Sequence, residues 1–86
     1  MTERNIVAIL VDHRQESAEK VQKILTGWGC MIRTRLGLHE GVLDNCSQSG
    51  LLLLEMVGEK EKIEDFVHKV NLVKGACAKL VSLTVE

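Results

Sequence analysis

The side chains with the most evident chemical potential follow the first aliphatic segment of the chain, in the stretch Asp12–Ser17. This stretch directly precedes an expected helix, whose free N–H groups and dipole favour an anionic ligand. It contains no glycine that would let a phosphate approach the backbone, so it is neither a P-loop nor a dinucleotide fingerprint. Helix capping by Asp12 or Ser17 is the simplest role of this stretch, and a ligand-binding site formed by Asp12, His13, Arg14 and Ser17 is the alternative.

Two arginines in a later segment, Arg33 and Arg35, could add positive charge to such a site. Their spacing of two residues places both on one face of an expected strand. Guanidinium groups bind carboxylates and phosphates, so the pair could clasp an anionic ligand. We expect ion pairing with Glu3, with Glu55 or with a partner chain, and the binding of an anionic ligand is the alternative.

A second group of reactive residue types lies between the middle strands, where His39 and Cys46 accompany Glu40 and Asp44. All four residue types bind transition metals. The segment has no repeated Cys/His pairs at zinc-finger spacing. A metal- or redox-responsive sensor that uses His39 and Cys46 is therefore the alternative function, and the sequence identifies no cofactor.

Nothing in the sequence predicts an enzyme. The chain has no G-x-S-x-G, H-E-x-x-H or G-x-x-x-x-G-K-[ST] run. Its three cysteines are an odd number without C-x-x-C spacing, which disfavours a disulfide framework and indicates the cytoplasm. We expect Cys30 and Cys77, at helix-to-strand junctions, to be buried structural thiols and Cys46 to be exposed.

Hydrophobic periodicity predicts the elements that must position these residues. Residues 38–49 are polar and form an expected connecting loop. The expected strands are Arg4–Val11, Cys30–Leu36, Gly50–Val57 and Ala78–Val85, and the expected helices are Ser17–Trp28 and Glu59–Leu72. Right-handed crossovers then place both helices on one face of a four-stranded antiparallel sheet. Residues 1–86 are thus predicted to form a single α+β domain, a ferredoxin-like βαββαβ sandwich in which the first and third strands are central.

The two central strands are apolar on both of their faces, whereas a sheet covered on one face only should alternate apolar and polar residues. The face without helices should therefore carry a hydrophobic strip, which usually marks an interaction surface. We expect a second copy of the chain to bury it, in a dimer or a tetramer. The predicted interface residues are Val7, Ile9, Val11, Leu51 and Leu53.

Charge and hydropathy exclude other partners. The net charge is −1, without the basic excess that supplies most of the affinity for nucleic acid, so direct nucleic-acid binding is not expected. The longest apolar run, Leu51–Leu54, is far shorter than the roughly 20 residues that span a membrane. The amino-terminal residues have no signal-peptide architecture. We expect a cytoplasmic protein without a membrane partner.

One stretch of the chain resembles a known family. It comprises Arg35-Leu36-Gly37 after an aliphatic strand, a polar loop, Cys46-Ser47, and then Gly50-Leu51-Leu52-Leu53-Leu54-Glu55. The stretch, together with the first strand and the helix that begins near Ala18, is similar to the iron-only hydrogenase system regulators. Their fold resembles the ACT domain and the carboxy-terminal domain of nickel-responsive repressors. The resemblance implies an ACT-like dimer or tetramer with a regulatory role that responds to a small ligand or a protein partner.

Two departures limit what this resemblance implies. ACT domains that bind amino acids usually have a glycine in the loop after the first strand, and Asp12–Ser17 has none. The nickel repressors use several histidines and one cysteine, of which only His39 and Cys46 are loosely comparable. The ligand of this chain is therefore left open at the level of the sequence.

Overall fold

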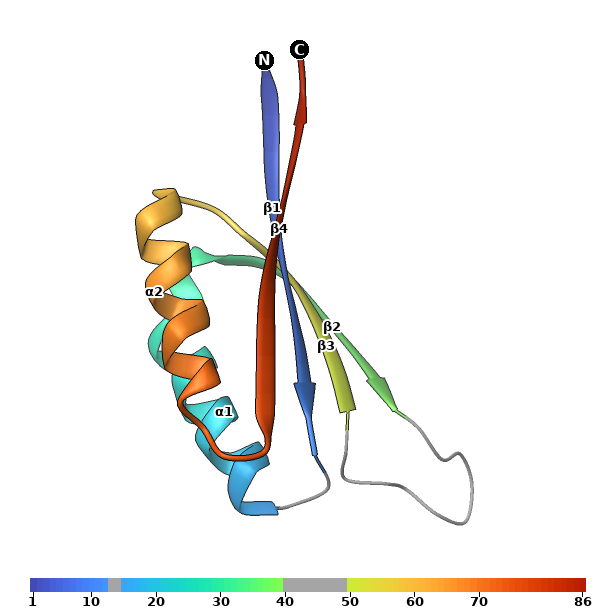
Figure 1. The fold of residues 1–86 in the computed structure, drawn as a ribbon, viewed down its shortest axis with the longest axis vertical. Coiled ribbons are helices and arrows are strands. Elements are labelled where there is room, and N and C mark those ends of the chain that lie inside the picture. The colour runs from blue at the N-terminus through green and yellow to red at the C-terminus, as the bar shows by residue number, and fades with distance from the viewer. Residues whose placement is uncertain (13–14, 40–49) are drawn as a thin grey trace.

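Strands and helices follow one another along the chain in the predicted βαββαβ order (Figure 1). The computed structural model describes residues 1–12, 15–39 and 50–86. The elements are β1 (Thr2–Val11), α1 (Gln15–Gly27), a short 3₁₀ helix (Gly29–Met31), β2 (Ile32–His39), β3 (Gly50–Met56), α2 (Lys60–Asn71) and β4 (Ala76–Val85).

The strands form one antiparallel sheet in the order β2-β3-β1-β4, so the first and third strands are central as predicted. Both helices cover the same face of the sheet, and the other face carries no element of the described chain (Figure 1). The architecture is the predicted ferredoxin-like α+β sandwich. The amino end of β1 and the carboxyl end of β4 lie side by side and project beyond the helices.

Several element boundaries differ from the prediction, among them those of β1 and β2. β1 begins at Thr2 because Thr2 pairs with Val85 of β4. β2 begins only at Ile32, since residues 29–31 form the 3₁₀ helix, and it extends to His39 into the predicted loop. The remainder of that loop, residues 40–49, lies outside the described residues.

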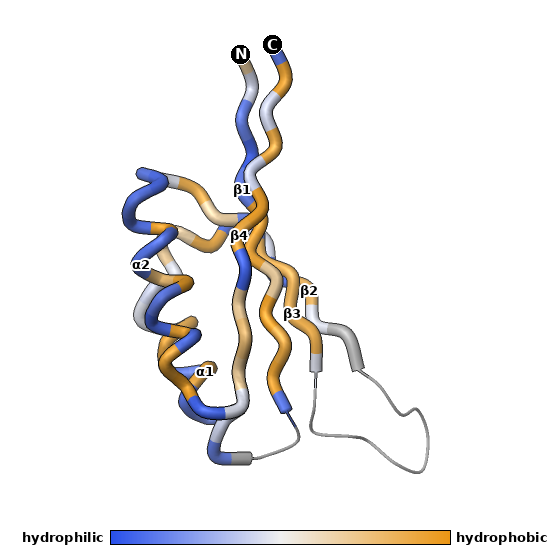
Figure 2. The backbone as a smooth tube through the Cα atoms, viewed as in Figure 1, coloured by the Kyte–Doolittle hydropathy of each residue, from blue (hydrophilic) through white to orange (hydrophobic). Residues whose placement is uncertain are grey.

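The hydrophobic core lies between the helices and the sheet and is mainly aliphatic. On α2, Ile63, Phe66 and Val70 are buried at helical spacing, and Phe66 packs edge-on against Trp28 with 5.7 Å between the ring centroids. The sheet and α1 contribute Val7, Ile9, Val11, Leu54, Met56, Ala78, Val21 and Leu25. Figure 2 shows that β1 and β3 are hydrophobic along most of the part that the helices cover. The core thereby fixes which face of each strand is left outside.

The end of α2 is fastened to the edge strand β4. The side-chain amide of Asn71 donates to the Ala78 carbonyl at 3.0 Å, and its oxygen accepts from the Ala78 N–H at 2.7 Å. This reciprocal pair satisfies both backbone groups of Ala78, which lies on an edge strand.

Candidate functional site

The sheet face opposite the helices is apolar, and we call it the open face. The register pairs Ala8 with Leu53, Leu10 with Leu51 and Ile6 with Val81, so these side chains point to the same side. The apolar residues of the open face are Ile6, Ala8, Leu10, Leu36, Leu51, Leu53, Val81, Leu83 and Val85. Five of them, Leu10, Leu36, Val81, Leu83 and Val85, are 47% to 68% exposed. The predicted hydrophobic strip therefore exists.

The strip is made by different residues of β1 than the sequence suggested. Val7 and Ile9 are 0% exposed and Val11 is 5% exposed, and all three point into the core beneath the helices. Their placement on the open face was wrong, because a strand that is apolar on both faces gives no periodic signal for its orientation. Leu51 and Leu53 do lie on the open face. Their role in an interface stays a prediction.

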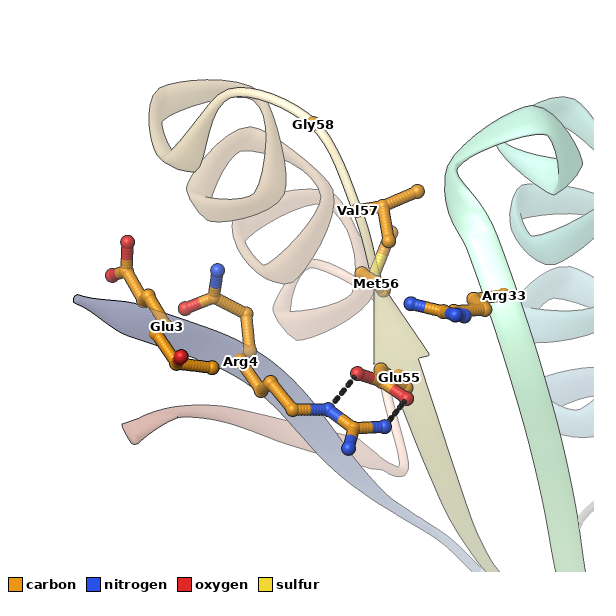
Figure 3. Close-up of a pocket in the computed structure, with 9 residues that line it drawn as sticks. Glu3, Arg4, Arg33, Glu55, Met56, Val57 and Gly58 are labelled. Carbon is orange, nitrogen blue, oxygen red and sulfur yellow. Dashed lines mark hydrogen bonds and ion pairs between the residues drawn. The ribbon is translucent and has the colours of Figure 1, made fainter. Parts of the chain in front are cut away.

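An ion pair borders the open face near the projecting chain ends (Figure 3). The Arg4 Nε and Nη2 atoms donate to the Glu55 Oε2 and Oε1 atoms, each at 2.6 Å. The two parallel hydrogen bonds join the central strands β1 and β3 through a side-on guanidinium–carboxylate contact. The hydrogen bond from Arg4 lowers the pKa of Glu55 against an opposing effect of desolvation, and the positive charge of Arg33 lowers it further.

Beside this ion pair lies an open groove with a volume of about 430 Å³. It is lined by Thr2, Glu3, Arg4, Asn5, Arg33, Glu55, Met56, Val57 and Gly58. Figure 3 shows the guanidinium of Arg33 pointing from β2 toward the end of β3, whereas the carboxylate of Glu3 points away from Glu55. The groove thus gathers two guanidinium groups and one carboxylate, and we call it the arginine groove.

A β-bulge separates the two arginines that were expected on one face. The pairing of β2 with β3 shifts register between Ile32 and Thr34, which makes Arg33 the additional residue. Arg33 faces the arginine groove. The Arg35 Nη2 atom instead donates to the side-chain oxygen of Gln22 on α1 at 2.7 Å. The expectation that Arg33 and Arg35 share a face was therefore wrong, since it assumed unbroken alternation.

The start of α1 is packed against the turn that precedes β4. The Ser17 hydroxyl is buried and donates to the Lys74 carbonyl at 2.7 Å, and the Asp12 N–H donates to the Gly75 carbonyl at 2.8 Å. These contacts give Asp12 and Ser17 a structural role. Residues 13 and 14 lie outside the described residues, so a ligand role for Asp12, His13, Arg14 and Ser17 stays a prediction. Asp12 follows the carboxyl end of β1, whereas Arg33 lies near its amino end, so the structure does not bring the predicted ligand residues into one site.

The structure does not test the predicted metal pair. His39 is the last residue of β2, and Cys46 lies outside the described residues. In the ranges 1–12, 15–39 and 50–86, no group of three His, Cys, Asp or Glu residues is placed to hold a metal ion. Cys30 and Cys77 are exposed, contrary to the buried placement expected, because Cys30 lies in the 3₁₀ helix and Cys77 points outward from β4. None of the described helices has the length and apolar character to span a membrane.

Sequence reasoning missed Arg4 as a site residue. It considered Glu55 as a partner for Arg33 or Arg35, yet the carboxylate is held by an arginine 51 positions away. The available signal was strand parity: once Ile6 is paired with Glu55, Arg4 must lie on the same face two residues along β1.

Comparison with known proteins shows the fold of this chain. No protein-family model matches the chain, and no curated protein matches it. An uncharacterized protein from Thermotoga maritima is similar in structure, with a TM-score of 0.80 at 21% identity over 96% of this chain and 100% of that chain. The ACT domain of GTP pyrophosphokinase from Chlorobium tepidum has a TM-score of 0.64 at 15% identity over 92% of this chain and 96% of that domain.

A third solved structure is a nitrogen regulatory PII-like protein from Thiomonas intermedia K12, determined with bound ADP, AMP and bicarbonate. Its TM-score is 0.64 at 6% identity, over 99% of this chain and 94% of that chain. At these identities the three similarities establish the architecture that ACT domains and PII-like proteins share.

Proposed function

We propose that this protein is a small regulatory domain that self-associates through its open face and responds to a small ligand or a protein partner. One observation carries the proposal: a sheet face with five large apolar side chains, each about half exposed or more. Contiguous exposed apolar patches on soluble domains usually mark interaction sites. The role assigned is regulatory and not catalytic, and its setting is the cytoplasm.

A second copy of the chain is the occupant that the charge pattern favours. The net charge is only −1, so two copies repel each other weakly. Glu55, the acidic residue that borders the strip on β3, is already neutralised by Arg4. Lys79 also lies on this face, but it belongs to the edge strand β4, where a long side chain can reach water from the rim of an interface.

The fold supports a regulatory role by analogy. A PII-like relative in structure carries bound ADP, AMP and bicarbonate, and a second relative is an ACT domain attached to GTP pyrophosphokinase. The resemblance of residues 35–55 to iron-only hydrogenase system regulators makes such a system the first biological setting in which to test the chain. Fold alone does not determine function, so the open face and not the analogy carries the proposal.

Sedimentation velocity with a matched pair of variants tests the proposal. Leu53→Glu places a charge in the centre of the open face, where it would be buried without a partner in the assembly. Thr84→Glu introduces the same charge on β4, at an exposed position whose side chain points to the opposite side. We expect the unmodified protein and Thr84→Glu to sediment as dimers or larger assemblies at micromolar concentration, and Leu53→Glu as a monomer. An unmodified protein that is monomeric would contradict the proposal.

A further inference from the structure

The arginine groove has hydrogen-bonding capacity that the protein itself does not use. The ends of three strands form it: the amino end of β1, the start of β2 and the carboxyl end of β3 (Figure 3). Its volume of about 430 Å³ lies within the range of roughly 300–1,000 Å³ that is typical of small-ligand pockets.

The two guanidinium groups of the groove have N–H donors that Glu55 does not use. A guanidinium group has five N–H donors, and Glu55 occupies one on Nε and one on Nη2 of Arg4. The Nη1 atom of Arg4 is not used in this contact. Within the described part of the chain, the side chain of Arg33 makes no hydrogen bond, and its interaction with Glu55 is purely coulombic. The side chains of Arg4, Arg33 and Glu55 together carry one net positive charge, and the carboxylate of Glu3 points away from them.

A β-bulge, which interrupts the pairing of β2 with β3, directs Arg33 toward the arginine groove. Without the bulge between Ile32 and Thr34, strand alternation would give Arg33 the same side as Arg35, which contacts α1. Bulges interrupt a ladder and commonly re-aim a side chain next to a binding site. Arg4 is held in place by two hydrogen bonds to a carboxylate that is only 14% exposed, although Arg4 itself is 62% exposed. One guanidinium is thus preorganised, and the other is free to close on a ligand.

We infer that the arginine groove binds the oxyanion group of a small molecule, a carboxylate or a phosphate, between Arg33 and the unused N–H groups of Arg4. Planar guanidinium groups match the geometry of both oxyanions and form charge-assisted hydrogen bonds with them. Val57, which is 41% exposed, lines the same groove and provides apolar contact for the rest of the ligand. Glu55 orients Arg4 and does not contact the ligand.

This inference deepens the proposed function, and it rests on that proposal only for the regulatory meaning of binding. The groove is formed within one chain, so binding itself does not require self-association. The two ideas can therefore fail separately.

Nuclear magnetic resonance titration of the full chain tests the inference. Inorganic phosphate and acetate are added separately at constant ionic strength, and the backbone amides of Val57 and Gly58 and the Nε–Hε groups of Arg4 and Arg33 are followed. We expect the chemical shifts at these positions to change and to saturate with at least one of the two anions. The dissociation constant should be on the order of millimolar. Saturation by phosphate alone indicates a phosphate-bearing ligand, and saturation by acetate alone indicates a carboxylate.

Two arginine variants provide the matched comparison. Arg33→Ala and Arg35→Ala remove the same charge from the same strand, but only Arg33 lines the groove. We expect Arg33→Ala to weaken anion binding by about tenfold or more, as for the loss of a charge-assisted hydrogen bond, and Arg35→Ala to leave it within about twofold. Equal weakening by both variants, or the absence of saturation up to about 20 mM of either anion, would overturn the inference.

Sedimentation of the same samples separates this inference from the proposed function. Saturable binding to a monomeric protein supports the groove and contradicts self-association. An oligomer that binds neither anion contradicts the groove and leaves the proposal about the open face intact.

Discussion

Neighbouring residues of β1 should respond very differently to the same truncation. Ile9 is 0% exposed beneath the helices, whereas Leu10 is 57% exposed on the open face. Each change to Ala removes three carbon atoms, about 2.4 kcal/mol of transfer free energy at about 0.8 kcal/mol per group. Ile9→Ala also leaves a cavity, so we expect a loss of about 2–5 kcal/mol. For Leu10→Ala only the remaining 43% of the side chain is buried within the chain, which scales the loss to about 1 kcal/mol.

Urea unfolding of the unmodified protein and both variants measures these losses. For 86 residues the total free energy of unfolding is on the order of 4–13 kcal/mol, so Ile9→Ala should remove a large share of it. The measurement is repeated over a range of protein concentrations, because any further cost of Leu10→Ala should grow with self-association. Equal losses for the two variants in dilute protein would refute the assignment of the two faces of β1.

Other changes test the packing of the turn before β4 and the ion pair. Gly75 has a φ of +88°, and a Cβ there would lie 2.5 Å from Asp12 Oδ2 and 2.6 Å from Ser17 Oγ. Gly75→Ala should therefore lower the free energy of unfolding, measured by urea titration, by at least about 2 kcal/mol. A Cβ at Gly27 would meet no atom within 4 Å, so Gly27→Ala should leave the free energy of unfolding unchanged or raise it by up to about 1 kcal/mol. Similar losses for the two glycine variants would contradict this account. Because Arg4 lowers the pKa of Glu55 in the folded state, the pair stabilises the fold above about pH 4.5 and loses this contribution as the pH falls through the lowered pKa. The difference in unfolding free energy between the unmodified protein and Glu55→Gln should therefore be small but present at neutral pH, because solvent screens the pair, and should vanish in strong acid. A difference that persists unchanged in acid would show that the ion pair is not its source.

Hydropathy was sufficient for the order of elements but not for the orientation of the central strand. The helical spacing of Ile63, Phe66 and Val70 identifies the buried side of α2 without knowledge of any other element. Ile9 and Leu10 are both aliphatic, so composition cannot decide which of them faces the helices. That choice depends on the register with β3 and β4, which forms between distant parts of the chain.

The candidate site was predictable only in part for the same reason. Charge and residue type singled out Arg33, but the bulge that separates it from Arg35 leaves no trace in the alternation of the sequence. The contact of Arg4 with Glu55 spans 51 positions and that of Ser17 with Lys74 spans 57, so neither follows from local spacing. Such contacts become predictable once strand register is known, because parity then assigns every side chain to a face.

The central claim is that a second copy of the chain covers the open face, and native mass spectrometry of the purified protein tests it most directly. One chain has a mass of 9.6 kDa, so a dimer has twice that mass, 19.2 kDa. We expect the 19.2 kDa dimer, or a tetramer of twice that mass, to dominate at micromolar concentration. Any small molecule retained from purification should appear as additional mass on the assembly. A spectrum that contains only the 9.6 kDa monomer throughout the micromolar range would contradict the claim.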